Sequence, residues 1–196
     1  MTRLHTAALA LLLAAAAGPG LAHTGPGDVA GVSSGFGHPF GGLDHMLAMV
    51  AVGLLGVQLG GRSVWLVPAA FLAMMLAGGA IGLAGSAGPI VEIGIAGSTI
   101  VLGAVIALGR HIPLSVTTGL TGVFGLCHGH AHGTEMPAAL SGLDFATGFI
   151  AATLLLHAAG FGLGLSARAL GRRTASLLVR TAGGTIAVVG TVTVVL

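Results

Sequence analysis

The hydrophobic positions of the chain fall into long stretches, separated by short breaks that contain glycine, arginine and proline. Each stretch approaches the ~20 apolar residues that a helix needs to cross a membrane. Helices are expected because lipid offers no partner for exposed backbone groups, and the alternating strands of a membrane barrel are missing. The pattern predicts six transmembrane helices, over residues 41–60, 64–84, 89–108, 112–131, 143–165 and 178–196.

Residues 1–22 have the pattern of a cleavable signal peptide. Arg3 supplies a positive start, residues 7–17 are an uninterrupted Ala/Leu run, and Ala22 is a small residue at the expected cleavage point. An uncleaved extra helix is the alternative, although this run is short for a span. The glycines and small polar residues of 23–37 predict an external loop before a six-helix domain at 38–196.

Composition supports an all-α, polytopic membrane protein. The chain is 55% hydrophobic and only 6% charged, whereas a soluble domain has about 25% charged residues. Because lysine is absent, a Walker A phosphate loop and Schiff-base chemistry are both excluded. Cys127 is the single cysteine, which excludes an intrachain disulfide, and no basic run or stacking aromatic group predicts nucleic-acid binding.

The charged residues separate onto two sides of the predicted bundle. Positive side chains mark cytoplasmic loops, and the breaks after the first, third and fifth spans carry Arg62, Arg110, Arg168, Arg172 and Arg173. Both mature termini are then periplasmic, in a bacterial inner membrane. The carboxylates all fall on the opposite, external side: Asp28, Asp44, Glu92, Glu135 and Asp144.

Glycines recur at a spacing of four within the spans. Such small-xxx-small pairs let helix backbones approach closely, which predicts a compact bundle with tight interfaces. The pairs are Gly56/Gly60, Gly78/Gly82, Gly129/Gly133 and Gly160/Gly164.

Three groups of ionisable residues lie at the external ends of the predicted spans. They are segment 38–45, which enters the first span, Glu92 in the third span, and segment 127–135 at the exit of the fourth. An ionisable residue inside a membrane is costly and indicates a functional site. Because the three groups are expected at similar depth, one shared site is predicted.

Helical geometry sharpens the third group. His128, His132 and Glu135 stand at i, i+4 and i+7, so they share one face of a continuous helix. On an extended segment His128, His130 and His132 would share a face instead. Imidazole and carboxylate together suit Zn, Ni, Co or Cu(II) better than Ca or Mg.

Several of these residues have alternative roles. Asp44 can bind metal, orient the imidazole of His45, or accept backbone N–H groups at the start of the first span. Glu92 can be a metal residue or a protonated carboxyl group that is hydrogen-bonded across helices. His157, deeper in the fifth span, fits either packing or a relay role, and Cys127 fits a small buried hydrophobe better than a ligand.

Residues 38–55 (HPFGGLDHMLAMVAVGLL) and 127–137 (CHGHAHGTEMP) resemble the HupE/UreJ family of small membrane proteins. That family is associated with hydrogenase and urease maturation and is regarded as transporting nickel. The signal and the six spans extend the resemblance over the whole chain, and Phe71 falls where the family tends to carry an aromatic residue. The resemblance implies metal residues at His38, Asp44, His45, Glu92, His132 and Glu135, with His128 close by.

The resemblance implies a secondary permease that brings Ni²⁺ into the cytoplasm for metalloenzyme maturation, with Co²⁺ or Zn²⁺ as alternative substrates and no organic cofactor. A cytoplasmic metallochaperone is the expected protein partner. One alternative is a membrane-embedded metal-dependent hydrolase, in which His128, His132 and Glu92 hold Zn²⁺ and Asp44 acts as base. Another is a metal sensor or membrane anchor, although the predicted cytoplasmic loops are short.

Overall fold

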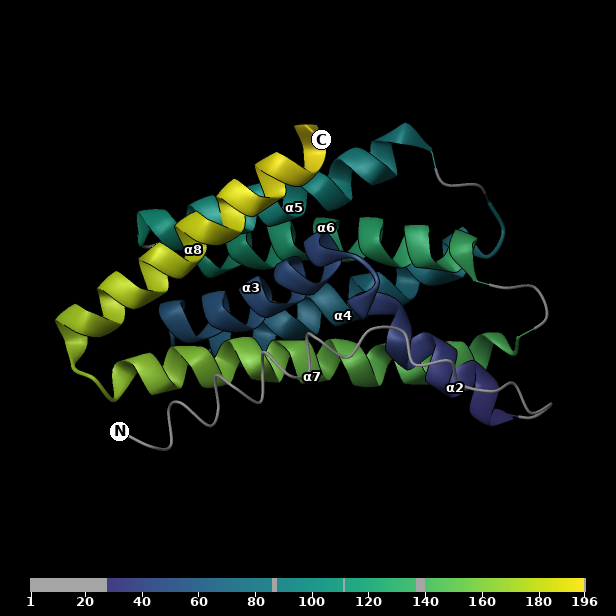
Figure 1. Ribbon diagram of the computed structural model, residues 1–196, viewed down its shortest axis with the longest axis horizontal. Helices are drawn as coiled ribbons and strands as arrows, with labels where there is room; N and C mark the ends of the chain where they lie inside the picture. Colours follow the sequence, from purple (N-terminus) through teal and green to yellow (C-terminus); the bar gives the residue numbers. More distant parts are fainter. Residues whose placement is uncertain (1–27, 86–87, 111, 137–139, 196) are drawn as a thin grey trace.

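The computed structural model describes residues 28–85, 88–110, 112–136 and 140–195, and every regular element in these ranges is helical. The predicted signal at 1–22 lies outside the described residues. The long helices run side by side, with α2 against one end of α7 (Figure 1). In chain order the elements are α2 (Asp28–Gly37), the 3-10 helix η1 (His38–Phe40), α3 (Leu43–Leu59), α4 (Ser63–Gly82), α5 (Pro89–Leu108), α6 (Leu114–Glu135), α7 (Gly142–Arg168) and α8 (Arg172–Val195).

The predicted stretches correspond to α3 through α8, and α5 begins and ends at the predicted residues. Glycine with positive φ ends several of the helices, because a side chain is strained in that conformation. Gly60 (φ 73°) ends α3, Gly109 (φ 62°) ends α5, and Gly171 (φ 93°) separates α7 from α8. Pro89 occupies the first turn of α5, where its missing N–H costs no hydrogen bond.

The six predicted spans are only partly confirmed. Among the described residues, α4, α5, α7 and α8 are long and apolar enough to cross a membrane. A fifth span is counted if the chain from Gly31 to Phe40 and α3, which meet at an 85° bend, form one broken span. By itself α3 has 17 residues. The polar side chains of α6, among them His128 and His132, explain why that helix falls short of an apolar span.

The predicted loop at 23–37 is wrong over its described part, because residues 28–37 form α2. Glycine in this segment serves helix packing. A Cβ at Gly35 would overlap the carbonyl oxygen of Phe145, and a Cβ at Gly148 would overlap that of Val32. The backbones of α2 and α7 therefore touch, and this contact compensates for the weak helix propensity of the segment.

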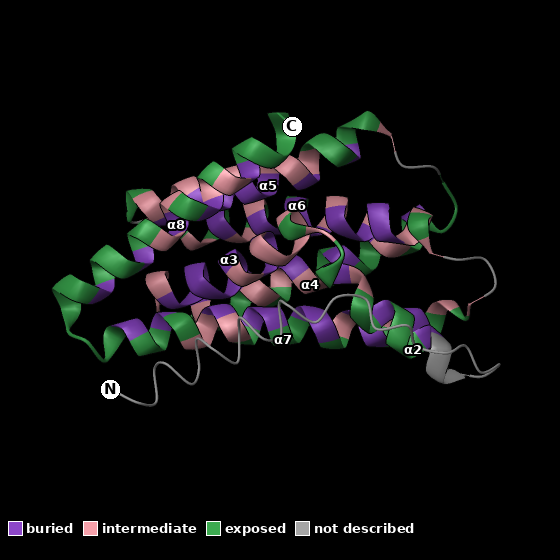
Figure 2. Ribbon diagram, viewed as in Figure 1, coloured by how far each residue is buried: buried purple, intermediate pink, exposed green. Residues whose placement is uncertain are grey.

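The core of the molecule is built around α3, which contacts α4, α5, α7 and α8. Figure 2 shows that buried residues dominate the middle of α3 and that much of α8 is exposed. Met49 and Leu55 of α3, together with Phe71 of α4, are among the largest fully buried side chains. The ionisable residues of α6 and α7 that point inward, His128 and His157, are therefore buried beside this central helix.

Candidate metal centre

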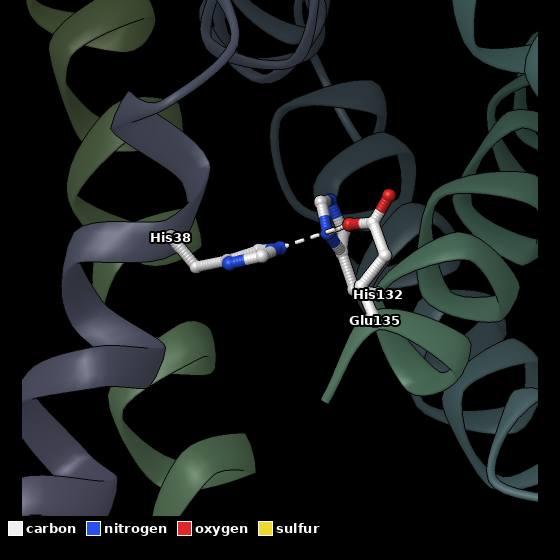
Figure 3. Close-up of side chains that lie close together, drawn as sticks. All are labelled: His38, His132 and Glu135. Atoms are coloured by element: carbon white, nitrogen blue, oxygen red, sulfur yellow. Dashed lines mark hydrogen bonds and ion pairs between the residues drawn. The ribbon is translucent and has the colours of Figure 1, made fainter. Parts of the chain in front are cut away.

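Three side chains from two segments meet at one end of the bundle. His38 comes from η1, whereas His132 and Glu135 come from the last turn of α6 (Figure 3). The Nε2 atom of His38 lies 3.1 Å from Oε2 of Glu135, and Nδ1 of His132 lies 3.5 Å from the same oxygen. One ligand atom from each residue lies within 4.8 Å of the other two. Two imidazoles and a carboxylate at this separation suit a borderline divalent transition metal.

The helix α6 supplies its two ligands because residues three positions apart face the same way. His132 is 5% exposed, and neither of its ring nitrogens has a hydrogen-bond partner among the described residues. The 3.5 Å approach to Glu135 is an ion-pair distance without hydrogen-bond geometry. A buried imidazole without hydrogen-bond partners is costly, which makes His132 a candidate metal ligand.

His38 reaches the centre because the chain turns sharply between η1 and α3. Pro39 lies at the start of η1, and the segments on either side of the break meet at 85°. The imidazole of His38 is then held against α7, with ring centroids 5.4 Å from Phe145 and 6.3 Å from Phe149. Nε2 of His38 donates to Oε2 of Glu135, and a metal ion held by both residues would take the place of that proton.

His45 and Asp44 begin α3 beside these ligands. The His45 ring lies 4.6 Å from that of His132 and 5.2 Å from that of His128, measured between centroids. Its Nδ1 donates to Oδ1 of Asp44 at 2.8 Å, which leaves Nε2 with the free lone pair. Oδ1 also accepts the backbone N–H of His45 at 2.9 Å. The arrangement therefore favours the orienting and helix-end roles of Asp44 over direct ligation.

His128 lies directly behind His45 and is fully buried. Its Nδ1 donates to the carbonyl oxygen of Phe124 at 2.8 Å, because a carbonyl can only accept. Nε2 is therefore the unprotonated nitrogen of the neutral ring, and it has no partner within the described part of the chain. The predicted common face of His128, His132 and Glu135 is present because α6 is helical to its end at Glu135.

Glycines hold α6 against α4 at the level of these histidines. A Cβ at Gly129 would overlap the carbonyl oxygen of Met75, and one at Gly133 would overlap that of Gly79. A Cβ at Gly78 would likewise overlap the carbonyl oxygen of Leu126. The predicted close approach of glycine pairs is thus found at this interface, and it fixes the rotation of α6 that turns His128 and His132 inward.

The structure does not join every predicted residue to the centre. Glu92 lies in the first turn of α5, where it is exposed and makes no hydrogen bond or ion pair to any described residue. Cys127 packs against Val91, Ile95 and Ala131, as expected of a small hydrophobe. The Zn²⁺ set expected for the hydrolase alternative is therefore not gathered here, because Glu92 makes no contact with the histidines.

Two residues that hold the metal-binding side chains in place were not predicted from the sequence. Thr99 of α5 donates to the backbone oxygen of Asp44 at 3.0 Å and so ties the start of α3 to α5. Phe149 of α7 packs against His132, with ring centroids 4.5 Å apart. A threonine or a phenylalanine in an apolar span carries no signal of its own, so only the packing of the helices identifies these positions.

A pocket of about 360 Å³ opens beside His132, between α4, α6 and α7. Its wall is mostly apolar and includes Met75, Phe145 and Phe149. His132 is thus shared between the ligand group and the pocket.

The amino-acid sequence is similar to known proteins along nearly its whole length. The model of the family described as "HupE / UreJ protein" matches residues 9–193. The chain is 43% identical to "Protein HupE" of Rhizobium leguminosarum bv. viciae over 179 residues, which are 91% of this chain and 92% of that protein. No solved structure matches the chain.

Proposed function

The chain belongs to the HupE/UreJ family, and from this premise we propose that it is a secondary permease for a divalent transition metal. Ni²⁺ is the proposed substrate and Co²⁺ the alternative, with transport across the bacterial inner membrane into the cytoplasm for metalloenzyme maturation. The observation that carries the proposal is the group of His38, His132 and Glu135, whose ligand atoms converge at one end of an apolar helix bundle. Imidazole and carboxylate ligands match such a cation.

The arrangement supports a capture step in water followed by movement inward. Glu135 is 56% exposed at its side chain and His38 29%, so both are accessible to an arriving ion. The ring of His45 lies beside two other imidazoles, 4.6 Å from that of His132 and 5.2 Å from that of the fully buried His128. The membrane potential is the proposed driving force, because it contributes about 2.3 kcal/mol per charge for each 100 mV and a dication gains about twice that.

The distribution of charge supports an external location for the centre. Arg168 donates to the carbonyl oxygen of Val57 near the end of α3, and Arg180 donates to that of Ala107 near the end of α5. His45, in contrast, lies at the start of α3. The arginines therefore lie toward the opposite end of the bundle, which the positive-inside rule assigns to the cytoplasm. We propose that the mature termini lie in the periplasm.

Uptake of radioactive nickel by intact cells tests the proposal. Cells with the wild-type protein are expected to accumulate Ni²⁺ above cells with an empty vector, and an uncoupler is expected to abolish the difference. The double variant His132→Ala/Glu135→Ala removes two of the three ligands and is expected to return uptake to the vector level. His130→Asn is the matched control, because His130 lies on α6 but faces Gly85, which follows the end of α4. Wild-type uptake by the double variant would contradict the proposal.

The pocket beside His132 is the one observation that favours the hydrolase alternative, because a metallohydrolase needs space for substrate next to its metal. The purified protein loaded with Zn²⁺ can be tested against apolar peptides and esters. Hydrolysis that disappears in the His132→Ala/Glu135→Ala variant, without nickel uptake by the wild type, would replace the permease proposal.

A further inference from the structure

His157 is a buried polar group that the capture step does not use. It lies in the middle of α7, about 22 Å along the helix from its first residue at a rise of about 1.5 Å per residue, and is 4% exposed. Its Nδ1 donates to the carbonyl oxygen of Met49 in α3 at 2.8 Å. Because Nδ1 carries the proton, Nε2 of the neutral ring presents a lone pair. Nε2 has no hydrogen-bond partner among the described residues.

The position of His157 is set by helix packing. A Cβ at Gly53 would overlap the carbonyl oxygen of His157, and a Cβ at Gly160 would overlap that of Val50. These contacts hold the backbones of α3 and α7 together on both sides of the hydrogen bond to Met49. Met49 follows His45 by four residues, so this bond lies about one helical turn deeper in α3 than the capture ligands.

His157 has the same design as His128. Each ring donates Nδ1–H to a backbone carbonyl at 2.8 Å and leaves a buried Nε2 without a partner. Metal-binding histidines are commonly oriented in this way, with the second nitrogen donating to a carbonyl group. Both rings also face Phe71 of α4, at centroid distances of 5.4 Å each. Phe71 therefore links the two imidazoles.

Neighbouring aromatic rings connect the partly exposed His38 with the buried His157. Neighbouring ring centroids are 4.7 Å apart for His38 and His132, 4.6 Å for His132 and His45, and 5.2 Å for His45 and His128. Phe71 and then His157 continue this series. Its inner members have neutral donors, whereas the carboxylates Asp44 and Glu135 lie at its outer end.

We propose that Nε2 of His157 is an inner ligand for the transported metal ion, which passes to it from Nε2 of His128 across the ring of Phe71. This inference rests on the proposed function, because it assigns the residue that receives the ion after capture. The ligand class is a divalent transition metal that accepts imidazole nitrogen, and the face of Phe71 offers a passing cation further attraction.

Two substitutions separate this role from a structural one. Asn at 157 can still donate to the carbonyl of Met49 in place of Nδ1, but it has no atom at the position of Nε2. Gln places its amide near Nε2 and does not reproduce the bond to Met49. If His157 only joins α3 to α7, Asn should be tolerated and Gln should be harmful. If Nε2 receives metal, Asn is the more harmful of the two.

The experiment measures the initial rate of Ni²⁺ uptake against Ni²⁺ concentration, divided by the amount of each protein in the membrane. His157→Asn is expected to lower the maximal rate about tenfold or more, the size of change seen when metal sites lose supporting groups. Its KM is expected to stay within about twofold of wild type, because the capture ligands remain. His157→Gln is expected to retain a higher maximal rate than His157→Asn, and His130→Asn is expected to match wild type.

A maximal rate for His157→Asn equal to wild type would overturn the proposal, as would the reverse order of the two variants. Calorimetric binding of Ni²⁺ to the purified variants checks that the capture ligands are intact in each. These outcomes can be distinguished from failure of the proposed function itself, because in that case the wild-type protein would take up no Ni²⁺ above the vector level.

Discussion

The capture ligands and the inner pair of His128 and His157 contain the same side chain in two different environments. The capture ligands His38, His132 and Glu135 include a carboxylate, Asp44 orients the neighbouring His45, and part of this group is exposed. The inner rings are at least 95% buried and have only backbone carbonyls as hydrogen-bond partners. Charge is therefore concentrated where water can still reach it.

This difference has a physical reason. A carboxylate deep in an apolar bundle is expensive to ionise, and an ionised one would bind a dication so tightly that it could not leave. A neutral imidazole offers a lone pair without a net charge. Transport requires that each position bind strongly enough to receive the ion and weakly enough to release it. In the proposed permease, the charged outer group would bind the ion more strongly than the neutral inner rings, which is the order that this requirement favours.

The substitution with the largest expected effect displaces α6, which carries two capture ligands and the inner residue His128. Gly129→Val places a side chain where the carbonyl oxygen of Met75 lies, so α6 must move away from α4. Overpacking of this kind costs about 1–3 kcal/mol or more, and here the clash is with backbone. We expect the yield of monodisperse protein and its thermal unfolding temperature to fall sharply. Gly119→Val is the matched control, because a Cβ at Gly119 meets nothing within 4 Å. Equal behaviour of the two variants would contradict the packing argument.

A smaller effect should fall on the capture group alone. Asp44→Asn removes the charge that orients His45 and leaves the inner rings in place. Loss of such an orienting partner typically lowers metal affinity by about 10–100-fold. The KM for Ni²⁺ uptake should rise by that factor while the maximal rate changes little. If the maximal rate falls and KM does not rise, Asp44 does not act in capture, and the proposed division between capture ligands and inner rings is wrong.

Acidification should produce the smallest of these effects at mildly acidic pH. An imidazole must be unprotonated to bind metal, and free imidazole has a pKa of about 6.5. As the pH falls, protons compete with the metal ion for its ligands, and KM should rise by up to about tenfold per pH unit for each imidazole that must lose a proton. Uptake measured between about pH 7 and pH 5.5, at a constant membrane potential, tests this. A pH-independent KM would mean that no imidazole ligand has to lose a proton before the ion binds.

Much of the fold could be predicted because a membrane imposes a simple length and polarity rule. The limits of α5 were predicted to the residue, and the common face of His128, His132 and Glu135 followed from helical spacing. The helix α2 could not be predicted from local propensity, because its stability depends on contacts of Gly35 and Gly148 that join distant parts of the chain. The glycines of this segment therefore predicted a loop, although in the structure they allow two helices to pack closely.

The candidate site was predicted by residue type but not by its depth. A sequence cannot show that Glu92 is exposed, or that His157 faces the same phenylalanine as His128. Both facts depend on how α4, α5 and α7 are rotated about their axes. Those rotations are set by close backbone contacts at glycines, and these contacts arise only when the helices are assembled.

The sharp turn after η1 divides the coordination sphere between two mechanically distinct parts of the chain. His132 and Glu135 belong to α6, which packs tightly against α4. His38 belongs to η1, and its position depends on the contact between α2 and α7. An ion held by all three residues would therefore depend on two separate helix pairs, and loosening either pair would cost it part of its ligand set.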